Sequence, residues 1–504
     1  MSGLGAPGVA AVKWSTVSTA GRFVLQLVAQ VVLARTLGPE IFGIFAIGMV
    51  VLTFAAFVSG FGFSWSLLQR VDLHDDDIRF AWTWQVIVGI VTMLTLYMTA
   101  PLLATYFRES RAQAVIEWLS LACLLTAAAA PATYLLQRDL NFKAVGLIQV
   151  VSYAVGYVLI GVPMALTGWG TASLVAAWLV QATVQLAASY ALKPHTIRPL
   201  FWYAGASSAF GTGRAVFLTN IVNWTLNNMD RIMIGRLLNA QALGLYNLAY
   251  NLATTPNTLL NALQPAFLAA GAQLQDQQQR LGRVYLQMIA TIMVLATPVF
   301  VFLALVSPDL VQLLYGPKWS DAGWVLSILF LSIPAYMVWG LSTPVLWNTG
   351  RKHYEFALQL PLVAAGALLF YFFAARGIRT AAAIAAMLLV LRALVIGIAA
   401  CRALNLPVMV FLPHLFRGLL LSLVCVAGVA GGQHLTGTLH MPVISLTVMT
   451  LITSVTAGAL IAIRPQILGC QTSKMVIRFF PRLSSLLQKA DSSVSTETLR
   501  EQRS

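Results

Sequence analysis

Apolar segments of about 20 residues recur along the whole chain, and they constrain its fold more than any other feature. A helix rises 1.5 Å per residue, so a segment of about this length crosses the ~30 Å hydrocarbon core of a membrane. The expected spans lie at residues 14–37, 41–66, 80–104, 114–136, 144–167, 171–192, 206–235, 243–268, 285–306, 322–346, 355–375, 380–402, 414–432 and 442–463. The sequence therefore predicts an all-α polytopic membrane protein of about 14 transmembrane helices.

The composition excludes a water-soluble fold. Of the 504 residues 59% are hydrophobic and only 9% are charged, whereas soluble domains carry roughly 25% charged residues. The cysteines form no C-x-x-C pair, the histidines are few and lie mostly in loops, and no phosphate-binding G-x-x-x-x-G-K-[ST] segment occurs. We therefore expect no metal, no nucleotide and no other cofactor, and no catalytic residues.

The net charge of +15 indicates topology rather than nucleic-acid binding. With the N-terminus inside, the inner segments hold about 20 Lys and Arg residues and the outer segments about 8, in accord with the positive-inside rule. This distribution predicts a multi-pass protein of the bacterial cytoplasmic (inner) membrane with both termini cytoplasmic.

An internal repeat connects two parts of the chain. The stretch ARTLGPEIFGIFAIG from Ala34 matches GRLLNAQALGLYNLA from Gly235 at an offset of 201 residues, which aligns Gly43 with Gly244 and Phe45 with Tyr246. An offset of six spans predicts a parallel duplication, two six-helix lobes around a central cavity. The expected parts are an N-terminal lobe at 1–200, a C-terminal lobe at 201–405, two additional helices at 406–463, and a basic, disordered cytoplasmic tail at 464–504.

Polar residues recur at helical spacing on the first helix of each lobe. Inside a bilayer an ionisable residue costs roughly 2.5–3.5 kcal/mol, so each requires a reason. In span 1 the stripe comprises Ser15, Thr19, Arg22, Gln26 and Gln30, and in span 7 it comprises Asn220, Asn223, Asn227 and Arg231, with Asn228 and Asp230 beside it. Two such stripes on equivalent helices favour a shared hydrated cavity.

The sign of the charge indicates what this cavity binds. Arg22 and Arg231 outnumber the one deep acid, Asp230, and guanidinium groups pair with phosphate oxygens in a bidentate manner. An anionic substrate with a diphosphate head is therefore favoured; the alternative is that Asp230 and Arg231 only pair with other helices. The candidate substrate-binding residues are Arg22, Gln26, Gln30, Asn220, Asn223, Asn227, Asp230, Arg231 and Arg214. Arg214 lies off the stripe, where it could also extend to the headgroups, and Arg392 in span 12 is interpreted as a peripheral or structural charge.

Several motifs occur in an order that resembles a known family. LARTLGPEIFGIFAI from Leu33, LLQRDLNFK from Leu135, MDRIMIGRLLNAQALGLYNLAY from Met229 and YGPKW from Tyr315 are similar to segments of the polysaccharide or oligosaccharide flippases (the PST, Wzx-like family) of the MOP superfamily. The resemblance implies alternating-access transport of an undecaprenyl-diphosphate-linked oligosaccharide from the inner to the outer leaflet, for polysaccharide export. It also implies that Arg22 and Arg231 hold the diphosphate.

The expected partners are this lipid-linked substrate, membrane lipids, H⁺ or Na⁺ as a candidate coupling ion, and a polysaccharide polymerase or export machinery. Three alternatives stay open from the sequence. They are a MATE-like cation or drug exporter, which would need a deep carboxylate in span 1, a lipid II flippase with another cargo, and a membrane glycan polymerase or glycosyltransferase.

Overall fold

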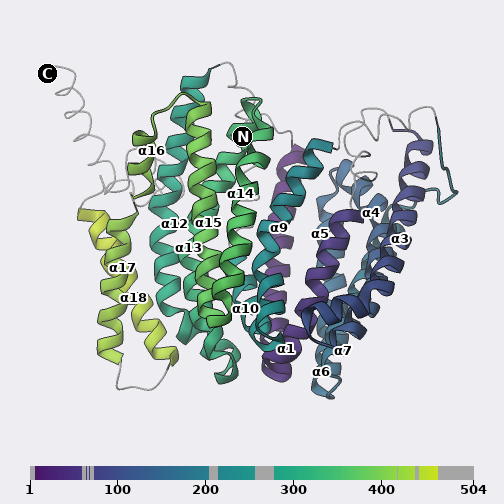
Figure 1. Ribbon diagram of the computed structural model, residues 1–504, viewed down its shortest axis with the longest axis horizontal. Helices are drawn as coiled ribbons and strands as arrows, with labels where there is room; N and C mark the ends of the chain where they lie inside the picture. Colours follow the sequence, from purple (N-terminus) through teal and green to yellow (C-terminus); the bar gives the residue numbers. More distant parts are fainter. Residues whose placement is uncertain are drawn as a thin grey trace. The chain divides into compact units, whose positions relative to one another are not determined.

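We analysed a computed structural model, which describes residues 6–59, 64, 67, 73–203, 214–255, 277–416, 418–436 and 442–463 (Figure 1). Within these residues every regular element is a helix. Eleven helices there are long and apolar enough to cross a membrane. The predicted all-α membrane fold is confirmed.

Each of the fourteen expected spans overlaps a helix of the described chain. One apolar helix, Gly21–Ala56, overlaps both of the first two spans, while spans 7 and 8 correspond to α9 (Arg214–Leu237) and α10 (Ala240–Thr254). The exact number of crossings stays a prediction. The tail expected at 464–504 lies outside the described residues.

The chain divides into two compact units, Met1–Asn247 and Leu248–Ser504. The first contains α1 (Ala6–Ser59), α3 (Asp75–Phe107), α4 (Ala112–Arg138), α5 (Phe142–Tyr153), the π-helix η1 (Ala154–Gly161), α6 (Val162–Leu166), α7 (Thr171–Leu192), α9 and the start of α10. The lobe boundary that the repeat suggested at residue 200 stays a prediction.

The long helix α1 is two helices joined by a sharp break. Gly38 has φ 80° and ψ 173°, a conformation that side chains disfavour, and Pro39 follows it. Proline lacks a backbone donor but suits the first turn of a new helix. The corresponding break after α9 is at Asn239, whose side-chain oxygen accepts a hydrogen bond from the Ala242 amide at 2.8 Å. We call these breaks the first corner and the second corner.

The second unit contains α12 (Gln278–Tyr315), η2 (Pro317–Trp319), α13 (Ser320–Asn348), α14 (Lys352–Phe373), η3 (Ala374–Arg376), α15 (Ile378–Ala403), α16 (Val408–Leu415), α17 (Leu419–Thr436) and α18 (Pro442–Ile463). The last two helices pack closely because glycines replace side chains at their contact. A Cβ on Gly428 or Gly432 would lie 2.7–2.8 Å from Thr453 or Met449, and small residues are the usual means of close helix packing in membranes.

Candidate functional site

Arg22 is held against α5 inside the first unit. Its guanidinium donates a hydrogen bond to the side-chain oxygen of Gln149 at 2.9 Å. One turn earlier on α1, Ser18 lies so close to Gly146 that a Cβ on residue 146 would overlap it. Among the ion pairs of the described chain none includes Arg22. Its hydrogen-bond partner is a neutral amide, so among the described residues no carboxylate compensates its positive charge.

A stacked pair of tyrosines includes a ring that interacts with this arginine. Tyr153 interacts electrostatically with Arg22, and its ring stacks on that of Tyr157 with centroids 4.5 Å apart and an interplanar angle of 10°. Tyr157 lies in the π-helix η1, a helical form that often marks functional sites. Gln149, Tyr153 and Tyr157 were missed from the sequence because their stretch has no polar periodicity.

The α9 stripe is bonded more locally. The Asp230 carboxylate accepts hydrogen bonds from the Tyr246 hydroxyl at 2.5 Å and from the Arg231 amide at 2.8 Å. The Arg231 guanidinium donates to the Asn227 carbonyl oxygen at 2.9 Å and lies 4.0 Å from the Asp230 carboxylate. The charge of Arg231 is therefore partly compensated, whereas that of Arg22 is not.

The two stripes coincide under the repeat. At the offset of 201 residues, Arg22 corresponds to Asn223, Gln26 to Asn227 and Gln30 to Arg231. Of these six side chains only Arg22 and Arg231 are charged. Each stripe therefore has one arginine: Arg22 is the first of the three aligned positions on α1, and Arg231 is the last of the three on α9. The offset also pairs Asp230 with Ala29 and Tyr246 with Phe45, so the hydrogen-bonded pair of the second copy is an apolar pair in the first.

The two copies touch immediately after their corners. A Cβ on Gly43 would overlap the carbonyl oxygen of Ala240, and a Cβ on Gly244 would overlap that of Pro39. Because Pro39 and Ala240 are counterparts in the repeat, the contact is reciprocal. All four residues belong to the first compact unit. We call this contact the glycine crossing.

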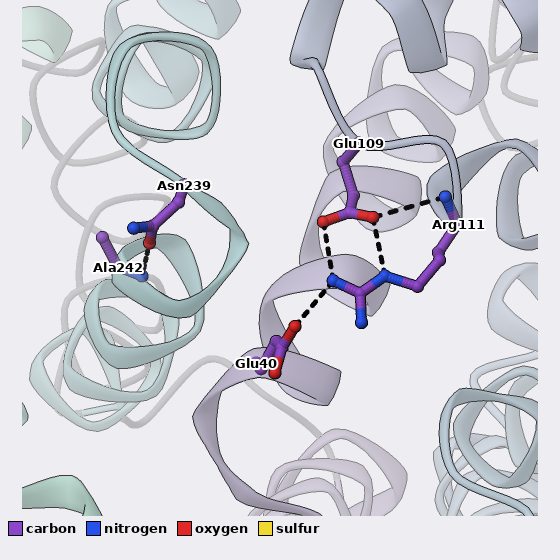
Figure 2. A network of polar contacts seen from close by, with 5 residues as sticks. All are labelled: Glu40, Glu109, Arg111, Asn239 and Ala242. Atoms are coloured by element: carbon purple, nitrogen blue, oxygen red, sulfur yellow. Dashed lines mark hydrogen bonds and ion pairs between the residues drawn. The ribbon is translucent and has the colours of Figure 1, made fainter.

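An exposed ionic network lies at the first corner. Arg111 donates to Glu40 at 2.6 Å and to the two carboxylate oxygens of Glu109 at 2.8 and 3.0 Å. Figure 2 shows this network together with Asn239 and Ala242 of the second corner. The hydrogen bond from the Arg111 side chain is the main cause that lowers the pKa of Glu109 below its ordinary value.

The second unit has a buried charged cluster of its own. Arg392 donates to the Gln359 side-chain oxygen at 2.5 Å and lies 3.7 Å from the centroid of the Trp339 ring. Gln359 in turn donates to Glu355, which also accepts from the Trp347 indole at 2.8 Å. Arg392, Gln359 and Glu355 are all 2% exposed or less. Their mutual bonding supports the structural interpretation of Arg392.

The family is decided by the sequence profile of the polysaccharide biosynthesis proteins, which matches residues 32–323. The chain belongs to this family. Among curated members it is 27% identical to the lipopolysaccharide biosynthesis protein WzxC of Escherichia coli over 333 residues, which cover 64% of this chain and 66% of that protein. It is 29% identical to the succinoglycan biosynthesis transport protein ExoT of Rhizobium meliloti over 381 residues, 74% of this chain and 73% of that protein. The resemblance predicted from the motifs is confirmed.

Two solved structures of membrane proteins share the fold of this chain. The lipid II flippase MurJ in an inward closed conformation matches 89% of this polysaccharide biosynthesis protein and 98% of its own chain, with a TM-score of 0.67 and 13% identity. An inward-facing multidrug resistance MATE family transporter matches 77% of this chain and 98% of its own, with a TM-score of 0.62 and 14% identity. At this identity the likeness establishes the fold.

The predicted site residues differ in burial, and not all of their side chains are described. Gln26 and Gln30 lie partly buried on the same helix as Arg22, and Asn223 and Asn227 lie partly buried on α9 with Arg231. Asp230 is 7% exposed. Arg214 and Asn220 lie on α9, but their side chains are outside the described part of this family member. Within the described chain no group of three or more His, Cys, Asp or Glu residues could hold a metal ion.

Proposed function

We propose that this protein is a flippase. It moves an undecaprenyl-diphosphate-linked oligosaccharide repeat unit from the inner to the outer leaflet of the bacterial cytoplasmic membrane by alternating access, for polysaccharide export. The lipid tail stays in the bilayer while the polar glycan crosses along the stripes of α1 and α9. Both termini are cytoplasmic, H⁺ or Na⁺ is the candidate coupling ion, and a polysaccharide polymerase receives the product.

The observation that carries this proposal is the uncompensated charge of Arg22 in a membrane helix. A cation at this depth is costly unless it serves a partner, and its protein ligand, Gln149, supplies no negative charge. An anionic substrate would supply it. The family membership supports the substrate class, since the named relatives serve the biosynthesis of lipopolysaccharide and succinoglycan.

The surroundings of Asp230 argue against a cation or drug exporter. A cation site needs a carboxylate whose negative charge is available, whereas the Asp230 carboxylate lies 4.0 Å from the Arg231 guanidinium and accepts hydrogen bonds from Tyr246 and Arg231. Transport of cationic dyes by the purified protein in vesicles would support the exporter instead.

The test is a deletion strain scored for lipid-linked repeat units on the inner leaflet. Loss of the gene should cause these units to accumulate and the exported polysaccharide to disappear, and the intact gene should reverse both effects. Arg22→Ala and Arg231→Ala should each fail to do so at normal membrane levels of folded protein. Normal export from both variants would contradict the proposed site, and rescue of a strain lacking its lipid II flippase would point to that cargo.

A further inference from the structure

We infer that Arg22 and Arg231 form two successive stations for the anionic head group at different depths, rather than one clamp. The inference rests on the proposed function. It adds an order to the path, with the head group bound first at Arg22 and then at Arg231.

The two corners give α1 and α9 a common reference point for depth. The glycine crossing joins the helices that leave the two corners within five residues of Gly38 and Asn239. The corners therefore lie at the same end of the first unit, and residues on α1 and α9 can be placed by their distance from them.

On this scale the arginines are separated. Arg22 precedes Gly38 by 16 residues and Arg231 precedes Asn239 by 8 residues. At 1.5 Å per residue these positions lie about 24 Å and about 12 Å before the corners, a difference of about 12 Å. This exceeds the ~8 Å Debye length at physiological ionic strength, so in a hydrated path the two cations act separately.

The chemistry of the stations fits delivery toward the corners. Arg22 is held by a neutral amide, so it offers its full charge to an incoming phosphate. Arg231 lies 4.0 Å from the Asp230 carboxylate, which reduces its attraction. Conduction through a membrane requires sites that bind well enough to admit a ligand and weakly enough to release it. The fully charged arginine lies far from the corners and the partly compensated one lies nearer to them.

The repeat provides exchanges that test depth separately from residue identity. Arg22→Asn with Asn223→Arg moves the guanidinium to the other helix at the same depth. Arg231→Gln with Gln30→Arg does the same at the second depth. Arg22→Gln with Gln30→Arg keeps the arginine on α1 but places both arginines at the second depth. Each exchange preserves the composition and net charge of the protein.

Export is measured in the deletion strain and normalised to folded protein in the membrane. Arg22→Asn alone should reduce export at least tenfold, and adding Asn223→Arg should restore most of it. Arg231→Gln alone should reduce export in the same way, and adding Gln30→Arg should restore most of it. The variant that combines Arg22→Gln with Gln30→Arg should export no more polysaccharide than the deletion strain. Equal export from the depth-changing and depth-preserving exchanges would overturn the inference, as would failure of both depth-preserving exchanges in folded protein.

A binding measurement covers the case in which an exchange misfolds. Purified protein in nanodiscs is titrated with farnesyl diphosphate, and farnesol serves as the uncharged probe. Arg22→Ala should weaken diphosphate binding at least tenfold, while Arg231→Ala should change it less than threefold, because the first station is intact. Equal weakening in both variants would support a single clamp and overturn the two-station order. If neither single variant impairs export, the proposed function's site fails as well.

Discussion

Gly43 of α1 and Gly244 of α10 each lie directly on the backbone of the other's helix, over the carbonyl oxygens of Ala240 and Pro39. The contact leaves no space for any side chain at either position. It holds together the two helices that follow the corners, and with them the two stripes.

Gly43→Ala and Gly244→Ala should each destabilise the protein and reduce export. Overpacking costs typically 1–3 kcal/mol, and here the obstacle is backbone, which cannot change rotamer. Thermal unfolding in detergent and export in the deletion strain measure the two effects. Gly21→Ala is the matched control on α1, because a Cβ there would have nothing within 4 Å. A stable, active Gly43→Ala variant would mean that these helices separate in the working state.

Tyr246→Phe should destabilise the first unit, because it leaves the buried Asp230 carboxylate without the hydroxyl that bonds it. An unsatisfied buried polar group costs roughly 1–3 kcal/mol or more when charged. Adding Asp230→Ala recreates the apolar pair, Ala29 and Phe45, that the first copy has at these positions. The double variant should therefore be more stable than Tyr246→Phe alone, and strictly additive losses would show that the two residues are not coupled.

The fold could be predicted from the sequence because hydrophobic length is a property of each segment alone. The fourteen apolar runs all overlap helices, and the first corner at Gly38 lies between the first two expected spans. The glycine crossing was visible only as an alignment of Gly43 with Gly244. The contact at these aligned residues depends on the packing of two helices about 200 residues apart in the chain. No local sequence pattern encodes such packing.

Only part of the candidate site could be predicted from the sequence. Arg22 and Arg231 are conspicuous because charge is rare in membrane segments. Their partners are not, since Gln149 and the stacked Tyr153 and Tyr157 lie in an otherwise apolar stretch. The sequence predicts a peripheral or structural charge at Arg392, but its cluster with Gln359 and Glu355 depends on the packing of α14 against α15, which the sequence does not reveal.

Gln149→Glu should abolish export while the protein stays folded. The substitution is nearly isosteric and would turn the neutral partner of Arg22 into a carboxylate, so the guanidinium would no longer be available to a phosphate. We expect at least a tenfold loss of export, with thermal stability changed by about 1 kcal/mol or less, as for most exposed or partly exposed ion pairs. Gln137→Glu, the same change on α4 at a side chain that is not the hydrogen-bond partner of Arg22, is the control. Undiminished export by the Gln149 variant would argue that Arg22 does not meet the substrate.

The network at the first corner should make stability sensitive to acid. The pKa of Glu109 is lowered in the folded state by Arg111, so its stabilising effect is present above the unfolded glutamate pKa of about 4.3 and is lost as the pH falls through the folded value. Arg111→Gln removes this contribution. The unfolding temperature of the native protein should therefore fall more steeply, as the pH decreases below about 5, than that of Arg111→Gln. Parallel curves would contradict the link between the two residues.

Arg392→Met should destabilise the second unit more than any other single change considered, because it removes the cation from a cluster that is 2% exposed or less and leaves Glu355 behind. Breaking a buried charged pair from one side costs about 3–5 kcal/mol, whereas replacing both charges is often nearly neutral. Adding Glu355→Gln should therefore recover much of the loss in thermal stability. Arg392→Lys should fall between the two, since it keeps the charge but loses the planar group that lies on Trp339 and donates to Gln359. If Arg392→Met remained stable but lost export, the cluster would belong to the transport path of the second unit and its structural interpretation would be wrong.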